Sequence, residues 1–185
     1  YRRLAGAPVL THTLRALAEA APDARLCVVI HPDDSELCAD AVGRLPTSAA
    51  ERVLPPAHGG ATRQQSVRAG LEALRETQPK IVLIHDAARP FATEALVEDA
   101  IAAARAHAAA VPGAPATDTL KQVDEASFVV ATPPRAALRA VQTPQAFDFD
   151  LIRDAHARAA AAGVDDLTDD GAVAEWAGHR VHVFA

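Results

Sequence analysis

Apolar residues recur along the chain with two alternating patterns, one typical of helices and one of buried strands. Residues 8–21 carry apolar side chains at helical spacing and stop before a proline, which predicts an amphipathic helix. Residues 26–30 form a continuous apolar run, as in a strand buried on both faces of a parallel sheet. A second helix is expected over about 35–45, so helix and strand alternate from the beginning.

The same alternation continues to the end of the chain. Thr62 and Gln65 form a capping-box pattern, in which Gln65 reaches back to Thr62 at the start of a helix that ends near Leu74. The remaining expected elements are a short strand at 52–54, a buried strand at 80–84, a helix capped by Thr93, a helix at 150–162, a helix starting at 168–170 and a strand at 181–184. Alternating units predict an α/β fold: a mostly parallel, twisted sheet with helices on both faces.

Residues 114–143 interrupt this alternation. Two short strand-like runs, 119–123 and 128–131, are joined by a polar four-residue turn. This pattern predicts a hairpin that forms an arm rather than part of the sheet.

Composition and charge limit the classes of function. A length of 185 residues favours a single domain, 1–185. The net charge of -6 argues against nucleic acid and anionic membrane as partners, because both need clustered basic residues. No stretch is apolar enough to span a bilayer and no export signal opens the chain, so a cytoplasmic location is expected. With no methionine and an unfinished final strand, both ends are expected to continue.

The loop His85–Pro90 follows the best candidate for a buried strand, where α/β sheets bind ligands. Asp86 could hold a magnesium ion or a ribose hydroxyl, and Arg89 could grip a phosphate with its planar fork. The alternative is an Asp–Arg ion pair that only shapes the turn.

Three further segments carry candidate chemistry. The glycine pair before Ser66 could let a backbone approach an anion or a base at a helix start, or could be an ordinary turn and cap. Thr119, Arg135 and Thr143 could complete a phosphate pocket, or Arg135 could be one solvated charge of an exposed arm. The acidic residues at 165–170 fit a helix start that interacts with the helix dipole better than a cation site.

Taken in order, these segments resemble the 2-C-methyl-D-erythritol 4-phosphate cytidylyltransferase family of the non-mevalonate isoprenoid pathway. The resemblance covers nearly the whole chain. The matching motifs are His85–Pro90, the pair Gly59–Gly60 with Arg63 and Ser66, Asp118–Thr119, Thr143–Gln145 and Thr168–Asp169. The resemblance implies a Rossmann-like nucleotidyltransferase fold, and a reaction in which the phosphate of methylerythritol phosphate attacks the α-phosphorus of CTP, releases pyrophosphate and is assisted by Mg²⁺.

The resemblance also assigns roles to residues. Gly60, Ser66 and Ala87 would contact the cytidine nucleotide, and Asp86 would lie between nucleotide, metal and acceptor. The acceptor phosphate would be bound by Arg89, Thr119, Arg135 and Thr143, with Asp86 and Arg135 as the catalytic residues. In the family the arm, 114–143, reaches into the second subunit of a homodimer, so Thr119 and Arg135 would serve the partner's site.

Two departures from the family leave alternatives open. The family's glycine-rich nucleotide loop, with its Arg and Lys, would precede Tyr1, and a phosphate-binding Lys would follow Ala185. Thr117 stands where many relatives carry Arg. A cytidylyltransferase for another polyol phosphate, such as ribitol 5-phosphate, and a catalytically silent nucleotide-binding dimer module are the competing interpretations. Fusion to a zinc-dependent cyclodiphosphate synthase is also open.

Overall fold

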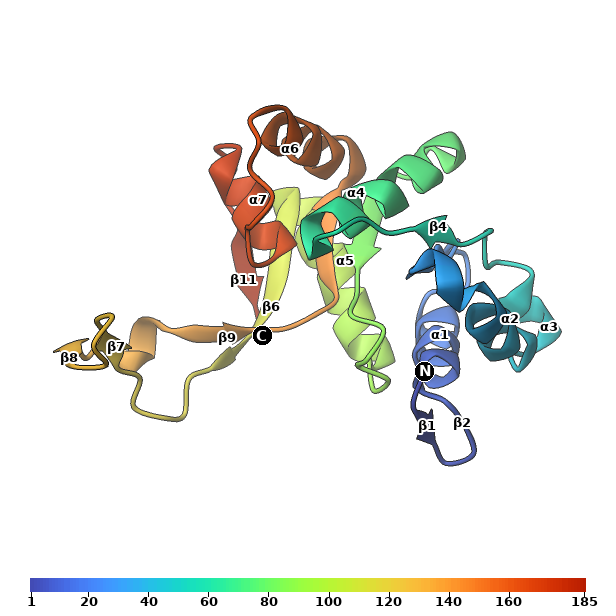
Figure 1. Ribbon diagram of the computed structural model, residues 1–185, viewed down its shortest axis with the longest axis horizontal. Helices are drawn as coiled ribbons and strands as arrows, with labels where there is room; N and C mark the ends of the chain where they lie inside the picture. Colours follow the sequence, from blue (N-terminus) through green and yellow to red (C-terminus); the bar gives the residue numbers. More distant parts are fainter.

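The computed structural model describes residues 1–185 and centres on one mixed sheet (Figure 1). Its strand order is β11–β6–β10–β5. These strands are β5 (Ile81–Ile84), β6 (Ala109–Pro115), β10 (Gln145–Asp148) and β11 (His182–Phe184). β11 is parallel to β6, and both β6 and β5 are antiparallel to β10, so three strands share one direction and β10 opposes them. The predicted alternation of helices and strands is confirmed.

Helices cover both faces of this sheet (Figure 1). They are α5 (Glu94–His107) on one face, and α6 (Phe149–Ala161) and α7 (Asp170–Trp176) on the other. Side chains of β5 alternate between the faces, as a strand requires. Ile81 and Leu83 pack with Ala104 of α5, whereas Val82 packs with Phe147 and other residues beneath α6 and α7.

A second hydrophobic cluster lies apart from the main sheet. It joins α1 (Val9–Ala20), α2 (Ser35–Gly43), α3 (Thr47–Ala50) and the parallel pair β3 (Val29–Ile30) and β4 (Ala57–His58). β3 has no hydrogen-bonded neighbour other than β4. The expected strand at 26–30 is therefore shorter than predicted, and Leu26 and Cys27 are only half-buried because their side faces a groove.

Helix α4 (Arg63–Leu74) begins as the capping pattern predicts. Thr62 is the N-cap, and its Oγ1 accepts the backbone N–H of Gln65 at 3.1 Å. The reciprocal bond differs in one detail, since Gln65 Oε1 accepts from the N–H of Ala61 rather than from Thr62. The start of α4 is thereby fixed beside the carboxyl end of β5.

Residues 114–143 run out from the sheet and back (Figure 1). On this segment lie β7 (Gln122–Val123), β8 (Val129–Ala131), the short 3-10 helix η3 (Arg135–Ala137) and β9 (Arg139–Val141). β7 pairs only with β8, and β9 pairs with the end of β6. Asp124 closes the hairpin because its Oδ1 accepts the N–H groups of Ala126 and Phe128.

The remaining elements are short. They are β1 (Arg3–Leu4), β2 (Ala7–Pro8), and the 3-10 helices η1 (Pro32–Asp34) and η2 (Arg75–Thr77). None of the helices combines the length and the apolar content that a membrane crossing needs.

Candidate active site

The loop after β5 is held in shape by a chain of hydrogen bonds. The N–H of Asp86 donates to Thr143 Oγ1 at 3.2 Å, and Thr143 Oγ1 lies 3.0 Å from His85 Nδ1. His85 Nε2 lies 2.9 Å from the carbonyl oxygen of Arg89, which can only accept. The ring proton is therefore on Nε2, and the Thr143 hydroxyl donates to Nδ1.

The buried Thr143 hydroxyl is expected to contribute measurably to stability. Replacing it by the isosteric Val leaves the Asp86 N–H and His85 Nδ1 without a partner, which costs about 1–3 kcal/mol of unfolding free energy. Urea denaturation measures the difference. The control, Thr143→Ser, keeps the hydroxyl but removes the methyl group, and should lose less. A Thr143→Val protein as stable as the wild type would show that the two hydrogen bonds contribute nothing.

His85 is kept neutral by its surroundings. Burial lowers the pKa of the imidazole below its usual value, and the positive charge of Arg89 lowers it further. The bond to the Arg89 carbonyl and the charge of Asp86 act in the opposite direction without cancelling the effect. A neutral His85 preserves the tautomer that both of its hydrogen bonds require.

Asp86 lies between two arginines. Its Oδ2 accepts from Arg89 Nε at 3.1 Å, and its Oδ1 lies 3.9 Å from Arg63 Nη2. Arg89 also donates to Gln142, whose amide oxygen fixes the far end of the guanidinium. The Asp86 side chain is 41% exposed, so a ligand can reach it. The Asp86–Arg89 ion pair that the sequence suggested as an alternative is present. Both side chains are partly exposed, so the pair can also contact a ligand.

The glycines at 59 and 60 allow the chain to approach the start of α4 closely. A Cβ on Gly60 would lie 2.5 Å from the Cβ of Gln65, and one on Gly59 would lie 2.7 Å from Ser66 Oγ. The N–H of Gly60 donates to Ser66 Oγ at 3.2 Å. Gly60 and Ser66, both assigned to nucleotide binding, are therefore neighbours, and Arg63 of the same helix turn reaches Asp86.

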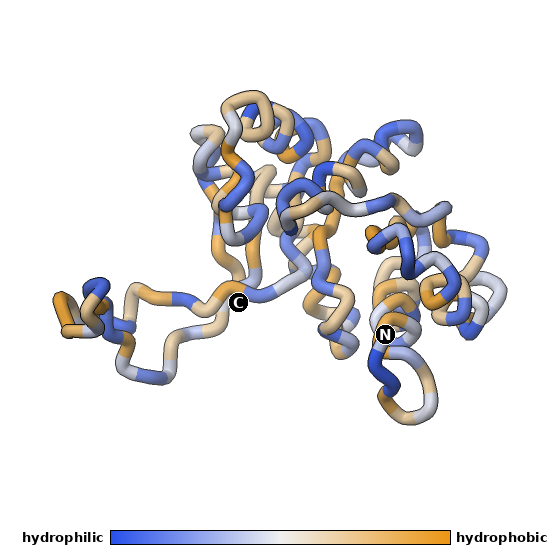
Figure 2. Tube along the Cα trace, viewed as in Figure 1, coloured by the Kyte–Doolittle hydropathy of each residue, from blue (hydrophilic) through white to orange (hydrophobic).

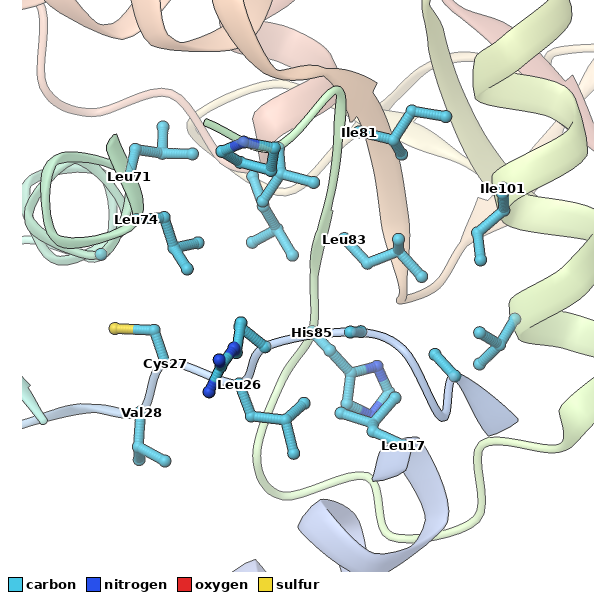
Figure 3. Close-up of a pocket in the computed structure, with 18 of the residues that line it drawn as sticks. Leu17, Leu26, Cys27, Val28, Leu71, Leu74, Ile81, Leu83, His85 and Ile101 are labelled. Atoms are coloured by element: carbon cyan, nitrogen blue, oxygen red, sulfur yellow. The ribbon is translucent and has the colours of Figure 1, made fainter. Parts of the chain in front are cut away.

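A groove of about 1080 Å³ opens beside these residues (Figure 3). Figure 3 shows Leu26, Cys27 and Val28, just before β3, on one side of it and Ile81 and Leu83 of β5 on another, with Leu71 and Leu74 of α4 and the ring of His85 also lining it. Ser66, Asp86 and Ala87 also line this groove. Thr13 of α1 donates to the carbonyl oxygen of Ala87 at 2.7 Å and so holds the loop at its rim.

The structure brings together most of the sequence-predicted residues but not all of them. Asp86, Ala87, Arg89 and Thr143 belong to one hydrogen-bonded loop region, with Gly60 and Ser66 across the groove; their ligand roles stay predictions. Thr119 and Arg135 lie on the outgoing segment, where Arg135 donates to the carbonyl oxygen of Thr117 at 3.0 Å. Figure 1 shows β7 and β8 well away from the loop after β5, whereas β9 ends at Val141, next to Gln142, which accepts from Arg89.

Sequence reasoning missed a buried polar cluster next to this loop. Asp169 caps α7, as the acidic helix start predicts, because its Oδ1 accepts the N–H of Ala172 at 2.8 Å. Asp170 has a different role: its side chain is 0% exposed and accepts from Arg63 and His156. Asp170 stands in the first turn of α7, as predicted for a helix-start acid, but its burial and its pairing with Arg63 and His156 were not predicted. The sequence signal for this pairing is Arg63: a basic residue at the start of α4, three residues after Gly60, needs an acidic partner.

The fold and this site together define a class of protein. A sheet with helices on both faces, and with polar loops and a helix start converging beyond the end of β5, is an α/β nucleotidyltransferase fold. The model of the family described as 2-C-methyl-D-erythritol 4-phosphate cytidylyltransferase matches residues 1–185. The chain belongs to this family.

Curated relatives and solved structures agree with this assignment. The chain is 53% identical over 184 residues to a bifunctional enzyme IspD/IspF of Rhodopseudomonas palustris, and 52% identical to the one of Nitrobacter winogradskyi. Each match covers 100% of the chain but 45% of the relative, so the chain spans about half of these proteins.

Two solved structures superpose closely. The first, 4-diphosphocytidyl-2C-methyl-D-erythritol synthase from Anaerococcus prevotii, has a TM-score of 0.88 and 31% identity, and the match covers 100% of the chain and 79% of that protein. The second, 2-C-methyl-D-erythritol 4-phosphate cytidylyltransferase from Thermus thermophilus, has a TM-score of 0.73 and 34% identity, covering 98% and 80%.

Proposed function

We propose that this chain transfers CMP from CTP to 2-C-methyl-D-erythritol 4-phosphate and releases pyrophosphate, in the synthesis of isoprenoid precursors. The observation that carries the proposal is the accessible Asp86, flanked by Arg63 and Arg89 beyond the end of β5, with Ser66 lining the same groove and Gly60 bonded to Ser66. A carboxylate, the fixed guanidinium of Arg89 and a glycine-bordered helix start are suited to a nucleotide and a second phosphate. Family membership supports the choice of CTP and the acceptor.

The reaction needs alignment and charge stabilisation more than a protein nucleophile. An oxygen of the acceptor phosphate attacks the α-phosphorus of CTP, and the bond from that phosphorus to the pyrophosphate oxygen breaks. Arg89 is held by Asp86 and Gln142, so its guanidinium has a fixed orientation and its remaining N–H groups can donate to a phosphate. Gly60 and the start of α4 approach the nucleotide, and the loop from Asp86 to Arg89 lies between the two substrates.

Magnesium fits Asp86 as a single protein ligand. Asp86 Oδ1 has no hydrogen bond, its oxygen is a hard donor, and no cluster of three or more metal-ligating side chains exists in the chain. Mg²⁺ is commonly bound through one carboxylate together with substrate phosphates. When bound, the ion would neutralise negative charge on the phosphates, and Asp86 would hold it against the nucleotide.

The groove beside Asp86 has room for a further strand. β3 pairs only with β4, and β5 pairs only with β10, so the two backbone edges that face the groove have unpaired N–H and C=O groups. We propose that residues preceding Tyr1 form a strand parallel to β5 between these edges. The family's glycine-rich loop would then follow this strand beside Asp86, at the carboxyl end of the sheet.

Adding the preceding residues should therefore stabilise the fold. The full-length protein is expected to melt at least about 10 °C above a chain of residues 1–185, because a strand that fills the groove buries apolar area on both of its faces. Calorimetry measures both melting temperatures, and binding of an apolar dye should be strong only for residues 1–185. Equal melting temperatures and equal dye binding would contradict the proposed strand.

The segment 114–143 is proposed to be a dimerisation arm. Its hairpin exposes apolar side chains that a monomer leaves in water. In Figure 2 the tip of the segment carries the orange colour of hydrophobic residues. The exposed fractions are 72% for Phe128, 56% for Val129 and 58% for Val130. An exposed apolar cluster of this kind marks an interaction surface. A second copy of the chain is the proposed partner, with Arg135 and Thr119 delivered to its acceptor site.

Pyrophosphate release by the full-length protein tests the proposed function. The assay contains CTP, Mg²⁺ and either methylerythritol phosphate or ribitol 5-phosphate, with controls that lack the acceptor or the metal. Release with methylerythritol phosphate alone supports the proposal. Faster release with ribitol 5-phosphate would reassign the acceptor, and no release with either would leave a nucleotide-binding module.

A further inference from the structure

A chain of charged side chains connects the interior beneath α6 and α7 with Asp86. The side chain of Asp170 is 0% exposed; its Oδ2 accepts from Arg63 Nη2 at 2.8 Å and its Oδ1 from His156 Nε2 at 3.0 Å. The same Nη2 lies 3.9 Å from Asp86 Oδ1. Arg63 therefore stands between a buried carboxylate and an exposed one, and is hydrogen-bonded only to the buried one.

Asp170 is held rigidly. Its backbone N–H donates to Gln145 Oε1 at 3.1 Å, and its carboxylate is bonded on both oxygens. His156 is 1% exposed, and its Nδ1 has no partner. The bond to a carboxylate requires a ring proton on Nε2, so His156 is the donor and Asp170 Oδ1 the acceptor. The carboxylate of Asp170 thus has one orientation.

The two carboxylates do not compete equally for Arg63. A charge-assisted hydrogen bond to a fully buried carboxylate is strong, and losing it would leave an uncompensated buried charge. The side chain of Asp86 is 41% exposed, so water screens its attraction to Arg63. Partial burial alone would lower the pKa of Arg63, but the charge of Asp170 and the bond to it, together with Asp86 and Asp169, raise the pKa above its usual value. Arg63 stays charged and stays with Asp170.

The position of Arg63 determines what Asp86 can bind. A movement of about 1 Å would bring Nη2 into hydrogen-bond range of Asp86 Oδ1, since such bonds are about 2.7–3.2 Å long. The planar fork of an arginine favours this pairing with a free carboxylate. Because Arg89 already occupies Oδ2, Asp86 would then have hydrogen bonds on both oxygens.

We propose that Asp170, oriented by His156, is a positioning residue that anchors Arg63 and keeps it from closing onto Asp86. Oδ1 of Asp86 then stays free for the substrates. The inference rests on the proposed function, in which Asp86 lies at the shared centre of nucleotide and acceptor binding. The anchor is distinct from a general contribution to folding, because its effect passes through one residue, Arg63.

Kinetics of full-length variants, measured well below their melting temperatures, test the anchor. Asp170→Asn weakens the hold on Arg63 and is expected to lower kcat/KM by about tenfold or more. Adding Arg63→Gln removes the side chain that blocks Asp86, so the double variant should be more active than Asp170→Asn alone and match Arg63→Gln alone. Asp154→Asn, the same change on an exposed site of α6, should leave kcat/KM unchanged.

Variants at His156 repeat the test without changing the buried charge. His156→Gln keeps an N–H donor for Asp170 and should keep most activity, whereas His156→Leu removes the donor and should lose more. A structural role alone predicts that both follow the melting temperature. Equal kcat/KM for the two variants, or a double variant Asp170→Asn/Arg63→Gln no more active than Asp170→Asn, would overturn the proposal.

A crystal structure of Asp170→Asn separates this inference from the proposed function. The anchor predicts that the Arg63 guanidinium lies within hydrogen-bond distance of Asp86 in the variant; an unmoved Arg63 would overturn it, whatever reaction the protein catalyses. Absence of pyrophosphate release by the wild-type protein would overturn the proposed function and the effect of the anchor on catalysis. The crystal structure of Asp170→Asn would still show whether Asp170 holds Arg63 away from Asp86.

Discussion

Asp86→Asn in the full-length protein is expected to lower kcat/KM for pyrophosphate release by about 10²- to 10³-fold. Asparagine keeps the shape of the side chain but removes the charge that would bind magnesium and that fixes Arg89 through Oδ2. The loss should fall mainly on kcat, because Asp86 lies where the two substrates meet. Steady-state assays that vary CTP and the acceptor separately give the partition between kcat and KM.

Stability should change little in the same variant. The ion pairs of Asp86 are exposed, so their removal costs at most about 1 kcal/mol, and the melting temperature should stay near that of the wild type. Asp99→Asn, on the exposed side of α5, is the matched control and should keep full activity. An Asp86→Asn protein that is folded and fully active would remove Asp86 from the reaction.

The elements that were predicted from sequence are those with a strong local pattern. Helix α4 begins at the capping residue Thr62, α5 at Thr93 and α7 at Asp169, because each cap satisfies N–H groups that any helix must satisfy. β5 was predicted because Ile81–Ile84 is apolar and three of its four residues are β-branched. Such signals depend on neighbouring residues in sequence and can be recognised without tertiary information.

Two central strands were missed because tertiary contacts override their composition. β6 contains four alanines or glycines and only one residue that a strand normally favours, Val111, together with Pro112 and Pro115. Its small residues are required by close neighbours: a Cβ on Gly113 would lie 2.4 Å from Val183. β10 is a four-residue strand that forms because it pairs with β5 and β6. Its own residues carry no local pattern that predicts this pairing.

In the candidate site, too, residues with a local sequence pattern could be predicted, and residues that depend on tertiary contacts could not. Asp86 and Arg89 could be predicted because they share one short loop after a recognisable strand. The pairing of Arg63 with Asp170 joins residues 107 positions apart and depends on how α4 packs near α7. Burial determines the interactions that Asp170 needs. An exposed acid at a helix start only interacts with the helix dipole, whereas a buried carboxylate must be paired with a cation or a hydrogen-bond donor.

The arm proposal makes a second large-effect prediction, which concerns two subunits. If Arg135 acts in the partner's site, each active site combines Asp86 of one chain with Arg135 of the other. Arg135→Ala should then be nearly inactive at ordinary acceptor concentrations, yet folded, because Arg135 is exposed and its bond to Thr117 is on the surface. Asp86→Asn should also be nearly inactive, so neither homodimer contributes much rate.

Mixing the two inactive full-length proteins, with subunit exchange, should restore activity. A heterodimer of Asp86→Asn and Arg135→Ala has one doubly damaged site and one site with both native residues. Random exchange makes half of the dimers mixed, so roughly a quarter of all sites become native. Activity should therefore rise to roughly a quarter of the wild-type value per site, and should follow the rate of exchange. If Asp86 and Arg135 acted within one chain, every site in the mixture would carry one substitution and mixing would restore nothing.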